Sequence, residues 1–285
     1  MLSVLFSMIE NRHHCNHCTA EYTFIQSLST RFTLAMDVMT HSSNFLLPSR
    51  PTDNGPSLSY ALVVLNQPLP RFTPLLWELD GGANRLYDEL PRLFPRDKPS
   101  DVRNRYKPDV IKGDMDSIRT EVLDFYRNLG TKIVDESQDQ DTTDLHKCVA
   151  LICEDTPTVD KSNLCILVAG ALGGRFDHEA GNINVLCCFS TVRIILLSDD
   201  CLIQLLPRTH RHEIQIQSSV EGPHCGLIPI GMRSGSTTTT GLQWDLNGTE
   251  MRFGGLVSTS NIVKERKITV QSDSDLLWTI SIKKP

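Results

Sequence analysis

Two aspartates on one short turn are the residues of this chain whose spacing most clearly suggests chemistry. Asp114 and Asp116 lie in the segment Gly113–Ser117. The apolar pair before it, Val110–Ile111, is typical of a buried strand, and Ile118–Leu129 after it has the apolar spacing of a helix. Open α/β sheets bind ligands at the carboxyl ends of their strands, and paired carboxylates there suit Mg²⁺ that carries a phosphate chain. The turn is therefore predicted to be a metal centre.

A glycine-rich segment follows the clearest strand of the chain. Leu164–Ala169 is continuously apolar and runs into Gly173–His178, where the glycines permit close approach of a ligand to the backbone. Arg175 offers a fork for phosphate oxygens, and Asp177 could cap the helix that begins there. Because no Gly-Lys-Ser or Gly-Lys-Thr follows the glycines, the segment is not a Walker A loop.

Further polar residues are expected near the same edge of the sheet. The segment Gln138–Asp144 opens a predicted helix, and its acidic and hydroxyl residues are ordinary caps. Their density exceeds what capping requires, so Gln140, Asp144 and Lys147 are candidates to reach a ligand. Asp80, at the start of an Asp-Gly-Gly turn, is another.

Composition excludes several classes of function. The chain has 285 residues, of which 40% are hydrophobic and 22% charged, and a net charge of −6 suggests neither a nucleic acid nor an anionic membrane as partner. No apolar run approaches the ~18 residues of a membrane span. Nine cysteines without framework spacing indicate a reducing compartment, and we expect the cytosol.

The chain is predicted to divide into three parts. Residues 1–55 are expected to form a poorly structured extension and linker, residues 56–199 an α/β domain of the Rossmann-like parallel α/β/α type, and residues 200–285 an antiparallel β-sandwich. The last part has short strand patterns and turns but no convincing helix.

The α/β part is too short, between its first strand and the turn at Asp80, to contain an expected helix and strand. Tyr60–Asn66 is typical of a central parallel strand, and only Gln67–Leu79 separates it from the turn at Asp80. A crossover to the next parallel strand alone needs about a dozen residues. We therefore expect that a helix and a strand are mostly missing here.

Four motifs, taken in order, resemble the thiamine pyrophosphokinase family. They are Asp80–Arg85, Gly113–Ser117, Asp139–Asp144 and Gly173–His178. The strand-rich tail agrees with the C-terminal signatures of that family at Thr239–Trp244 and Leu256–Asn261. Each motif alone is weak, but the ordered set is specific and covers about residues 60–283. Two departures stand out: the first 35 or so residues have no counterpart, and the segment before Asp80 is short.

The resemblance implies transfer of pyrophosphate from ATP to the hydroxyl of thiamine, giving thiamine diphosphate and AMP. It implies Mg²⁺ held by Asp114, Asp116 and Asp144, with Asp80 as a further acidic contact at the catalytic centre. Two carboxylates on one turn repel each other unless a cation lies between them, which agrees with the metal assignment.

Roles for the remaining candidates also come from the resemblance. The residues expected to bind ATP and its phosphates are Asn84, Arg85, Lys147, Arg175 and Asp177.

On the thiamine side, Gln140 is expected to contact the aminopyrimidine edge. Trp244, which is a core residue by default, could instead stack on the cationic thiazolium. Ser258, Ser260 and Asn261 are weaker candidates, and the sites are expected to lie between the subunits of a homodimer.

Two alternatives stay open at this level. One is another Mg²⁺-dependent nucleotide phosphotransfer enzyme, and the other is a non-catalytic variant that keeps ligand binding. The short segment before Asp80 could also leave the enzyme impaired.

Overall fold

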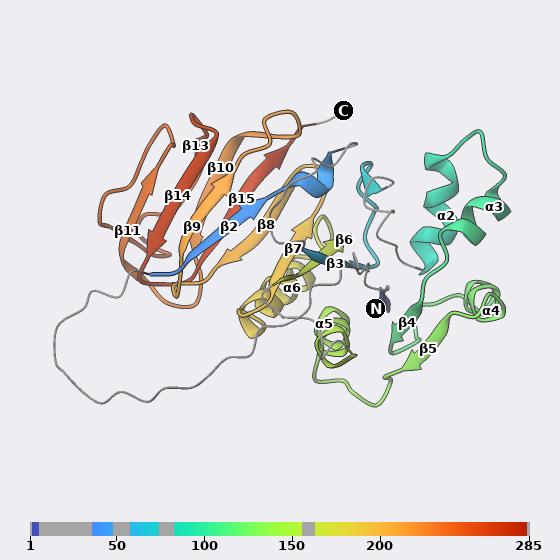
Figure 1. The fold of residues 1–285 in the computed structure, drawn as a ribbon. Coiled ribbons are helices and arrows are strands. Elements are labelled where there is room, and N and C mark those ends of the chain that lie inside the picture. The colour runs from blue at the N-terminus through green and yellow to red at the C-terminus, as the bar shows by residue number, and fades with distance from the viewer. Residues whose placement is uncertain (1, 6–35, 48–57, 74–82, 156–162, 284–285) are drawn as a thin grey trace, which may run out of the picture.

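The fold is known from a computed structural model of the chain (Figure 1). It describes residues 2–5, 36–47, 58–73, 83–155 and 163–283, with only the backbone described for residues 2–5. Asp80 and the rest of the Asp-Gly-Gly turn lie outside the described residues.

The chain is built around one ten-stranded sheet, whose strand order is β13-β10-β15-β8-β7-β6-β3-β1-β4-β5. The α/β half contains β1 (Leu2–Leu5), β3 (Ser59–Val64), β4 (Val110–Gly113), β5 (Lys132–Asp135), β6 (Leu164–Ala169) and β7 (Arg193–Leu197). Neighbours β3, β6 and β7 are parallel, as are β4 and β5. The strand β1 runs antiparallel to both β3 and β4. The carboxyl ends of β3 and β4 therefore point to the same edge.

Helices cover both faces of this half, as expected for a doubly wound sheet. They are α2 (Ala83–Leu93), α3 (Pro99–Arg105), α4 (Thr120–Asn128), α5 (Asp144–Asp155) and α6 (Phe176–Cys188). The first three pack on one face with Leu62, Val64 and Ile111, while α5 and α6 pack on the other with Ala61 and Val63. The helix after the Asp114 turn begins at Thr120 rather than Ile118, and it ends before Gly130, whose φ of 84° stops it.

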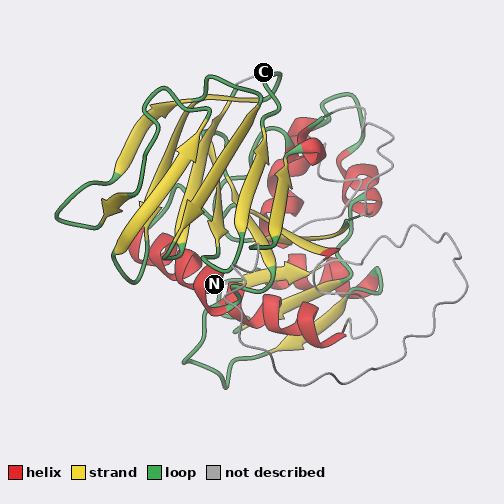
Figure 2. Ribbon diagram, turned by 60° about the vertical axis from the view of Figure 1, so that its left-hand side comes forward, coloured by secondary structure: helices red, strands yellow, loops and turns green. Residues whose placement is uncertain are grey.

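The β half continues the same sheet and adds a second one. Strand β8 (Cys201–Leu206) pairs antiparallel with β7, followed in the sheet by β15 (Leu276–Ile282), β10 (Glu221–Pro229) and β13 (Ser258–Ile262). The second sheet has the order β12-β11-β14-β9-β2 (Figure 2). Its strands are β2 (Val38–Ser42), β9 (Arg211–Gln215), β11 (Ser234–Thr240), β12 (Thr249–Met251) and β14 (Lys267–Ser272). The expected α/β plus β-sandwich architecture is confirmed, with the sheet unbroken at residue 200.

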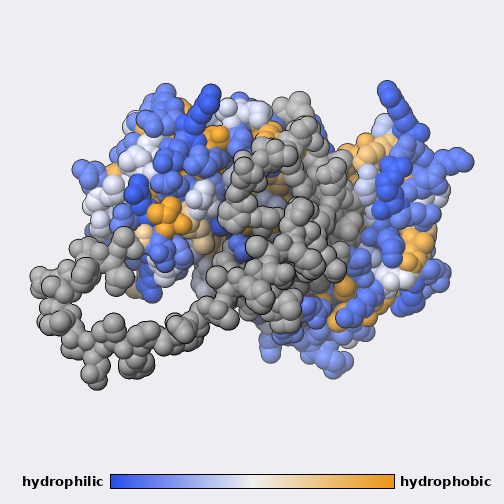
Figure 3. Space-filling view, in the orientation of Figure 1, coloured by the Kyte–Doolittle hydropathy of each residue, from blue (hydrophilic) through white to orange (hydrophobic). Residues whose placement is uncertain are grey.

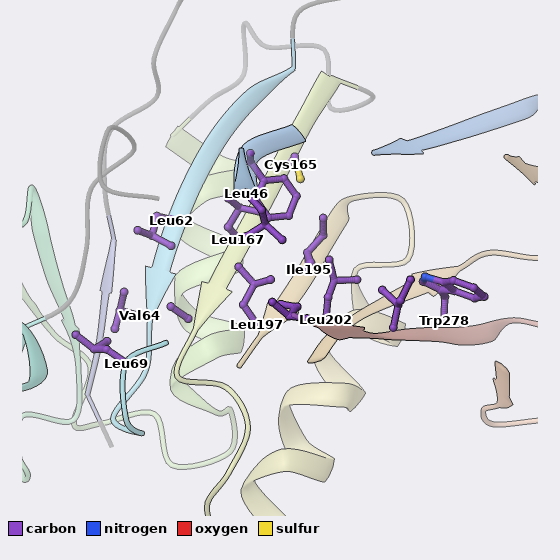
Figure 4. Close-up of a cluster of buried hydrophobic side chains, with 14 of the residues drawn as sticks. Leu46, Leu62, Val64, Leu69, Cys165, Leu167, Ile195, Leu197, Leu202 and Trp278 are labelled. Carbon is purple, nitrogen blue, oxygen red and sulfur yellow. The ribbon is translucent and has the colours of Figure 1, made fainter. Parts of the chain in front are cut away.

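One core extends through both halves. Figure 4 shows it running from Leu62 and Leu167 to Leu202 and Trp278. Trp278 is fully buried in it. On the face seen in Figure 3 the described surface is mostly hydrophilic, with apolar residues in small separate patches.

The extension predicted over residues 1–55 requires a correction. Strand β2 joins the β-sandwich parallel to β9, and the short 3₁₀ helix Asn44–Leu46 places Phe45 and Leu46 in the core at 2% exposure. The local sequence did not predict strand β2, because Val38–Ser42 mixes polar and apolar residues. It forms a strand by pairing with β9, which lies more than 160 residues further along the chain. Among the described residues 65–73 after β3 there is no strand, and the rest of the short segment Gln67–Leu79 lies outside the described residues.

Two buried histidines anchor β2 in the sandwich. His41 Nε2 lies 3.0 Å from His212 Nδ1, and His212 Nε2 lies 2.9 Å from the carbonyl oxygen of Pro207. Burial lowers the pKa of His212 to about 4, and nearby His210 and Arg193 act in the same direction. Burial likewise lowers the pKa of His41. Both rings are therefore neutral in the folded chain near neutral pH.

Acid should unfold the chain through these histidines. His212 becomes protonated below about pH 6.5 in the unfolded chain but only near pH 4 in the folded chain. Its contribution to the free energy of unfolding is therefore fully present above pH 6.5 and is lost as the pH is lowered toward 4. The contribution of His212 to this loss is about 3 kcal/mol at pH 4. Chemical denaturation from pH 7 to pH 4 measures it. The variant His212→Gln should show a shallower decline than the wild type, and equal slopes would contradict this account.

Candidate active site

The turn after β4 holds its two aspartates in a backbone conformation that is uncommon. Met115, between them, has a φ of 58°, a left-handed conformation that bulky residues rarely adopt. Its side chain packs against the core, so burial of Met115 compensates for the backbone strain. Burial has the largest single effect and raises the pKa of Asp114, but hydrogen bonds with Asp116 act together with other interactions to lower that pKa below its usual value. The two carboxyl groups are thus adjacent, as predicted.

Asn84, at the start of α2, fastens this turn. Its Nδ2 donates to the carbonyl oxygen of Ser117 at 2.9 Å, and its Oδ1 accepts from the backbone N–H of Arg119 at 3.4 Å. Arg85 faces the other way and forms an ion pair with Glu89. Glu89 also accepts from the backbone N–H of Leu69 at 3.1 Å. Asn84 and Arg85, two of the five predicted ATP-binding residues, therefore hold the loops that surround the turn.

Asp144 lies at the first position of α5 and is almost buried, with 8% exposure. Burial raises its pKa to about 6, and the charge of Asp114 acts in the same direction. A cation between the two carboxylates would reverse this effect. The structure thus brings Asp144 within the electrostatic reach of the Asp114 turn.

Lys147, one helical turn further, is also buried and points at the loop before α5. Its Nζ donates to the carbonyl oxygens of Asp139 at 2.5 Å and Glu136 at 3.4 Å. Gln140 in that loop is exposed, and its Nε2 donates to the carbonyl oxygen of Ser137 at 2.8 Å. Lys147 therefore fixes the loop that presents Gln140 near the acidic residues.

The glycine turn after β6 binds a carboxylate of the same chain, that of Glu179, which the sequence analysis did not predict. The backbone N–H groups of Gly173 and Gly174 donate to Glu179 Oε1 at 2.8 and 3.0 Å. Gln67 lies against the same turn, since a Cβ on Gly174 would meet its side-chain amide at 2.4–2.6 Å. The only sequence signal for Glu179 is an acidic residue in the first turn of α6, where carboxylates commonly bind free N–H groups.

Arg175 and Asp177 form an exposed ion pair with each other. Arg175 is the N-cap residue of α6 and its side chain makes no capping hydrogen bond, so Asp177 lies in the first turn of the helix and not at the cap position. Both side chains lie after the carboxyl end of β6 and are exposed to solvent, so an anionic ligand could replace Asp177 as the partner of Arg175.

Apart from Gln140, the predicted thiamine residues gather at the opposite edge of the sheet. Trp244 is 56% exposed and is not a core residue. The backbone N–H of Trp244 donates to Asn261 Oδ1 at 3.2 Å, and the backbone carbonyl oxygen of Trp244 accepts from Asn261 Nδ2 at 2.9 Å. Asn261 is 2% exposed and also donates to Ser258 Oγ at 3.3 Å. Asn261 thus holds Trp244 in place, and Ser260 beside it is exposed with a φ of 57°.

Asp245 supports the same turn and was not predicted. Its carboxylate accepts from the backbone N–H groups of Gly241 and Leu242, both at 3.1 Å, and from Thr239 Oγ1 at 2.8 Å. The indole of Trp244 is therefore presented to solvent on a turn anchored from both sides.

The acidic residues at the Asp114 turn and the residues around Trp244 lie far apart within one chain. Eight strand spacings separate β13 from β4, which at about 4.8 Å each is roughly 40 Å before the twist of the sheet is counted. Figure 1 shows β13 and β4 on opposite sides of the molecule. A single copy cannot place Trp244 against the Asp114 turn.

The donor set near the turn fits Mg²⁺ chemically. Among the described residues, no group of three or more His, Cys, Asp or Glu side chains could hold a metal ion. Mg²⁺ commonly uses one or two carboxylates and completes its shell with water and substrate phosphates, so the adjacent pair Asp114 and Asp116 provides enough ligands.

Comparison with known proteins gives consistent matches. The family model "Thiamin pyrophosphokinase, catalytic domain" matches residues 70–196, and "Thiamin pyrophosphokinase, vitamin B1 binding domain" matches residues 211–277. Thiamine pyrophosphokinase 1 of Arabidopsis thaliana is 71% identical over 257 residues, covering 88% of this chain and 96% of the relative. Thiamine pyrophosphokinase 1 of Oryza sativa subsp. japonica is 62% identical over 263 residues, covering 88% and 100%.

Solved structures share the fold. The crystal structure of yeast thiamin pyrophosphokinase superposes with a TM-score of 0.70 at 24% identity, over 90% of this chain and 95% of that one. The structure of thiamine pyrophosphokinase from Bacillus subtilis gives a TM-score of 0.61 at 22% identity, over 79% and 98%.

Removing the Asn261 amide should loosen the turn that carries Trp244. The variant Asn261→Ala leaves the backbone groups of Trp244 without their partner and should cost roughly 1–3 kcal/mol of unfolding free energy. Near-ultraviolet circular dichroism should report the change in the indole environment. The control Asn247→Ala alters an exposed residue of the same region and should change neither quantity. Equal behaviour of the two variants would contradict the role given to Asn261.

Proposed function

Because this chain belongs to the thiamine pyrophosphokinase family, we propose that its acidic turn and its exposed tryptophan form the two halves of the active site of a thiamine diphosphokinase. The reaction is the transfer of pyrophosphate from ATP to thiamine, which gives thiamine diphosphate and AMP. The relatives do not favour the two alternatives, a different nucleotide phosphotransferase and a non-catalytic variant.

The bond changes of this reaction define what the site must do. The thiamine hydroxyl oxygen attacks the β-phosphorus of ATP, and the bond from that phosphorus to the oxygen of the α-phosphate breaks. AMP leaves with the bonding electrons, and the hydroxyl gives up its proton. Such a transfer depends mostly on positioning and on stabilisation of phosphate charge.

The adjacent carboxylates of Asp114 and Asp116 are the observation on which this proposal depends. This pair would hold Mg²⁺, which would neutralise charge on the triphosphate when bound. Asp144, which forms no three-residue metal group with them among the described residues, lies within electrostatic reach and would act as the third ligand. Asn84 and Met115 keep the turn in shape before any ligand arrives. Either Asp116 or Asp144 would accept the hydroxyl proton, since both lie at this edge of the sheet.

ATP phosphates would be bound by Arg175 after it leaves its ion pair with Asp177. Asn84, Arg85 and Lys147 would act by holding the surrounding loops, as their hydrogen bonds indicate. Asp80 stays a predicted acidic contact of the same site.

Thiamine would lie between two copies of the chain. Gln140 accompanies the acidic turn, whereas Trp244, Ser258 and Ser260 lie about eight strands away. A homodimer with twofold symmetry could bring the tryptophan of one copy to the acidic turn of the other. There Gln140 would meet the aminopyrimidine and Trp244 the thiazolium.

The cytosol is the proposed location. The described cysteines are all free thiols, which agrees with a reducing compartment. Among the described residues, no helix has the length and apolar character needed to cross a membrane.

Replacing either aspartate of the turn should abolish most activity. Asp114→Asn and Asp116→Asn should each lower the rate of AMP and thiamine diphosphate formation by roughly 100-fold or more at saturating Mg²⁺, because phosphate charge loses its counterion. Asp124→Asn, which changes an exposed residue of α4 paired with Arg127, is the matched control.

Near wild-type rates in both variants would refute the metal assignment. Release of pyrophosphate instead of AMP would identify a nucleotidyltransferase, and thiamine binding without turnover in the wild type would identify a non-catalytic protein. Full wild-type turnover would exclude impairment by the short segment before Asp80.

Mixing two inactive variants tests the shared site. Asp114→Asn and Trp244→Ala damage opposite edges of the chain, so a mixed dimer has one site with both changes and one site with neither. After subunit exchange the mixture should recover about a quarter of wild-type activity, since half of the dimers are mixed and each has one intact site. Size-exclusion chromatography with light scattering should give the mass of two chains. Absence of recovery from well-exchanged dimers would place each site within a single chain.

A further inference from the structure

The sheet position between β3 and β4 is filled from a distant part of the chain. β1 lies there, with Leu5 opposite Val63 and Val4 opposite Val64 on one side, and residues 2–5 opposite residues 113–110 on the other. β3, β6 and β7 run parallel to one another, and so do β4 and β5, whereas β1 runs antiparallel to its two neighbours. A βα crossover from β3 would have supplied a parallel strand.

This position is enclosed on both faces of the sheet. On one face α2 packs with Val64 and Ile111, which are 2% and 0% exposed. On the other face α5 packs with Val63, which is fully buried. Without a strand between them, β3 and β4 would leave backbone N–H and C=O groups unpaired beneath helices, and such groups are strongly unfavourable when buried.

Among the described strands, β1 alone joins the pair β4 and β5 to β3 and the rest of the large sheet. In the order β6-β3-β1-β4-β5, neither β4 nor β5 pairs with any other described strand of the large sheet. The turn that carries Asp114 follows β4 directly, and Leu2 is paired with Gly113 at its base.

We propose that the gap between β3 and β4 is a strand-binding site for a short, extended apolar segment, and that Leu2–Leu5 of the same chain is its occupant. The segment Leu-Ser-Val-Leu has the composition of a buried strand and matches β4 in length. It binds by strand addition, in which main-chain hydrogen bonds supply the affinity. By filling the gap, residues 2–5 hold the acidic turn in register with the rest of the sheet. This inference rests on the fold and not on the catalytic assignment.

A proline in the full chain tests the occupant directly. Val4 pairs on both sides, so Val4→Pro removes an N–H that the sheet uses, whereas Val4→Ala keeps it. Hydrogen exchange at the amides of residues 110–113 should be about tenfold or more faster in the proline variant than in the alanine variant. Equal exchange in the two variants would overturn the proposal.

A cross-link decides the matter even if the proline variant does not fold. Cysteines placed at Val4 and Ile111, which lie opposite each other, should form a disulfide on mild oxidation that digestion and mass spectrometry detect. The control pair Val4→Cys with Ile133→Cys places the second cysteine one strand further away, in β5, and should not link. No link at Ile111, or equal linking at both positions, would overturn the proposal. A link found only between two chains would assign the site to a second copy and overturn the choice of occupant.

Discussion

Continuous backbone pairing across the large sheet is the constraint on which the rest of the structure depends. It runs without a break from β13 to β5 and joins the β half to the α/β half through the β7–β8 pair. Because β4 and β5 run parallel, the segments that follow them reach the same edge, where Asp114 and Asp116 lie near Asp144. The same pairing holds Trp244 at the far edge through its bonds to β13.

This separation is the reason that the proposed active site would need two copies of the chain. Phosphate chemistry requires hard oxygen ligands at the ends of parallel strands, whereas a cationic ring requires an exposed aromatic face. One sheet presents these features at opposite edges, so under the proposed function the two substrates would meet where two chains associate. The hydrogen bonds of Asn84 on one side and of the buried Asn261 on the other hold each half in shape within a single chain.

Local patterns predicted a large part of this arrangement. Val110–Gly113 and Leu164–Ala169 are short apolar runs whose strand character needs no partner to be recognised, and the Asp114 turn follows from its position between a strand and a helix. Long-range pairing could not be predicted in this way. The places of Leu2–Leu5 and Val38–Ser42, the hydrogen bonds from the glycine turn to Glu179, and the support of Trp244 by Asn261 all depend on residues brought together only by the fold.

The most direct test of the central claim is a crystal structure with Mg²⁺, an unreactive ATP analogue and thiamine bound. The account predicts Mg²⁺ coordinated by carboxylate oxygens of Asp114 and Asp116 together with phosphate oxygens, and the indole of Trp244 from a second copy against the thiazolium ring. A metal ion held by neither carboxylate, or thiamine bound entirely within one chain, would contradict it.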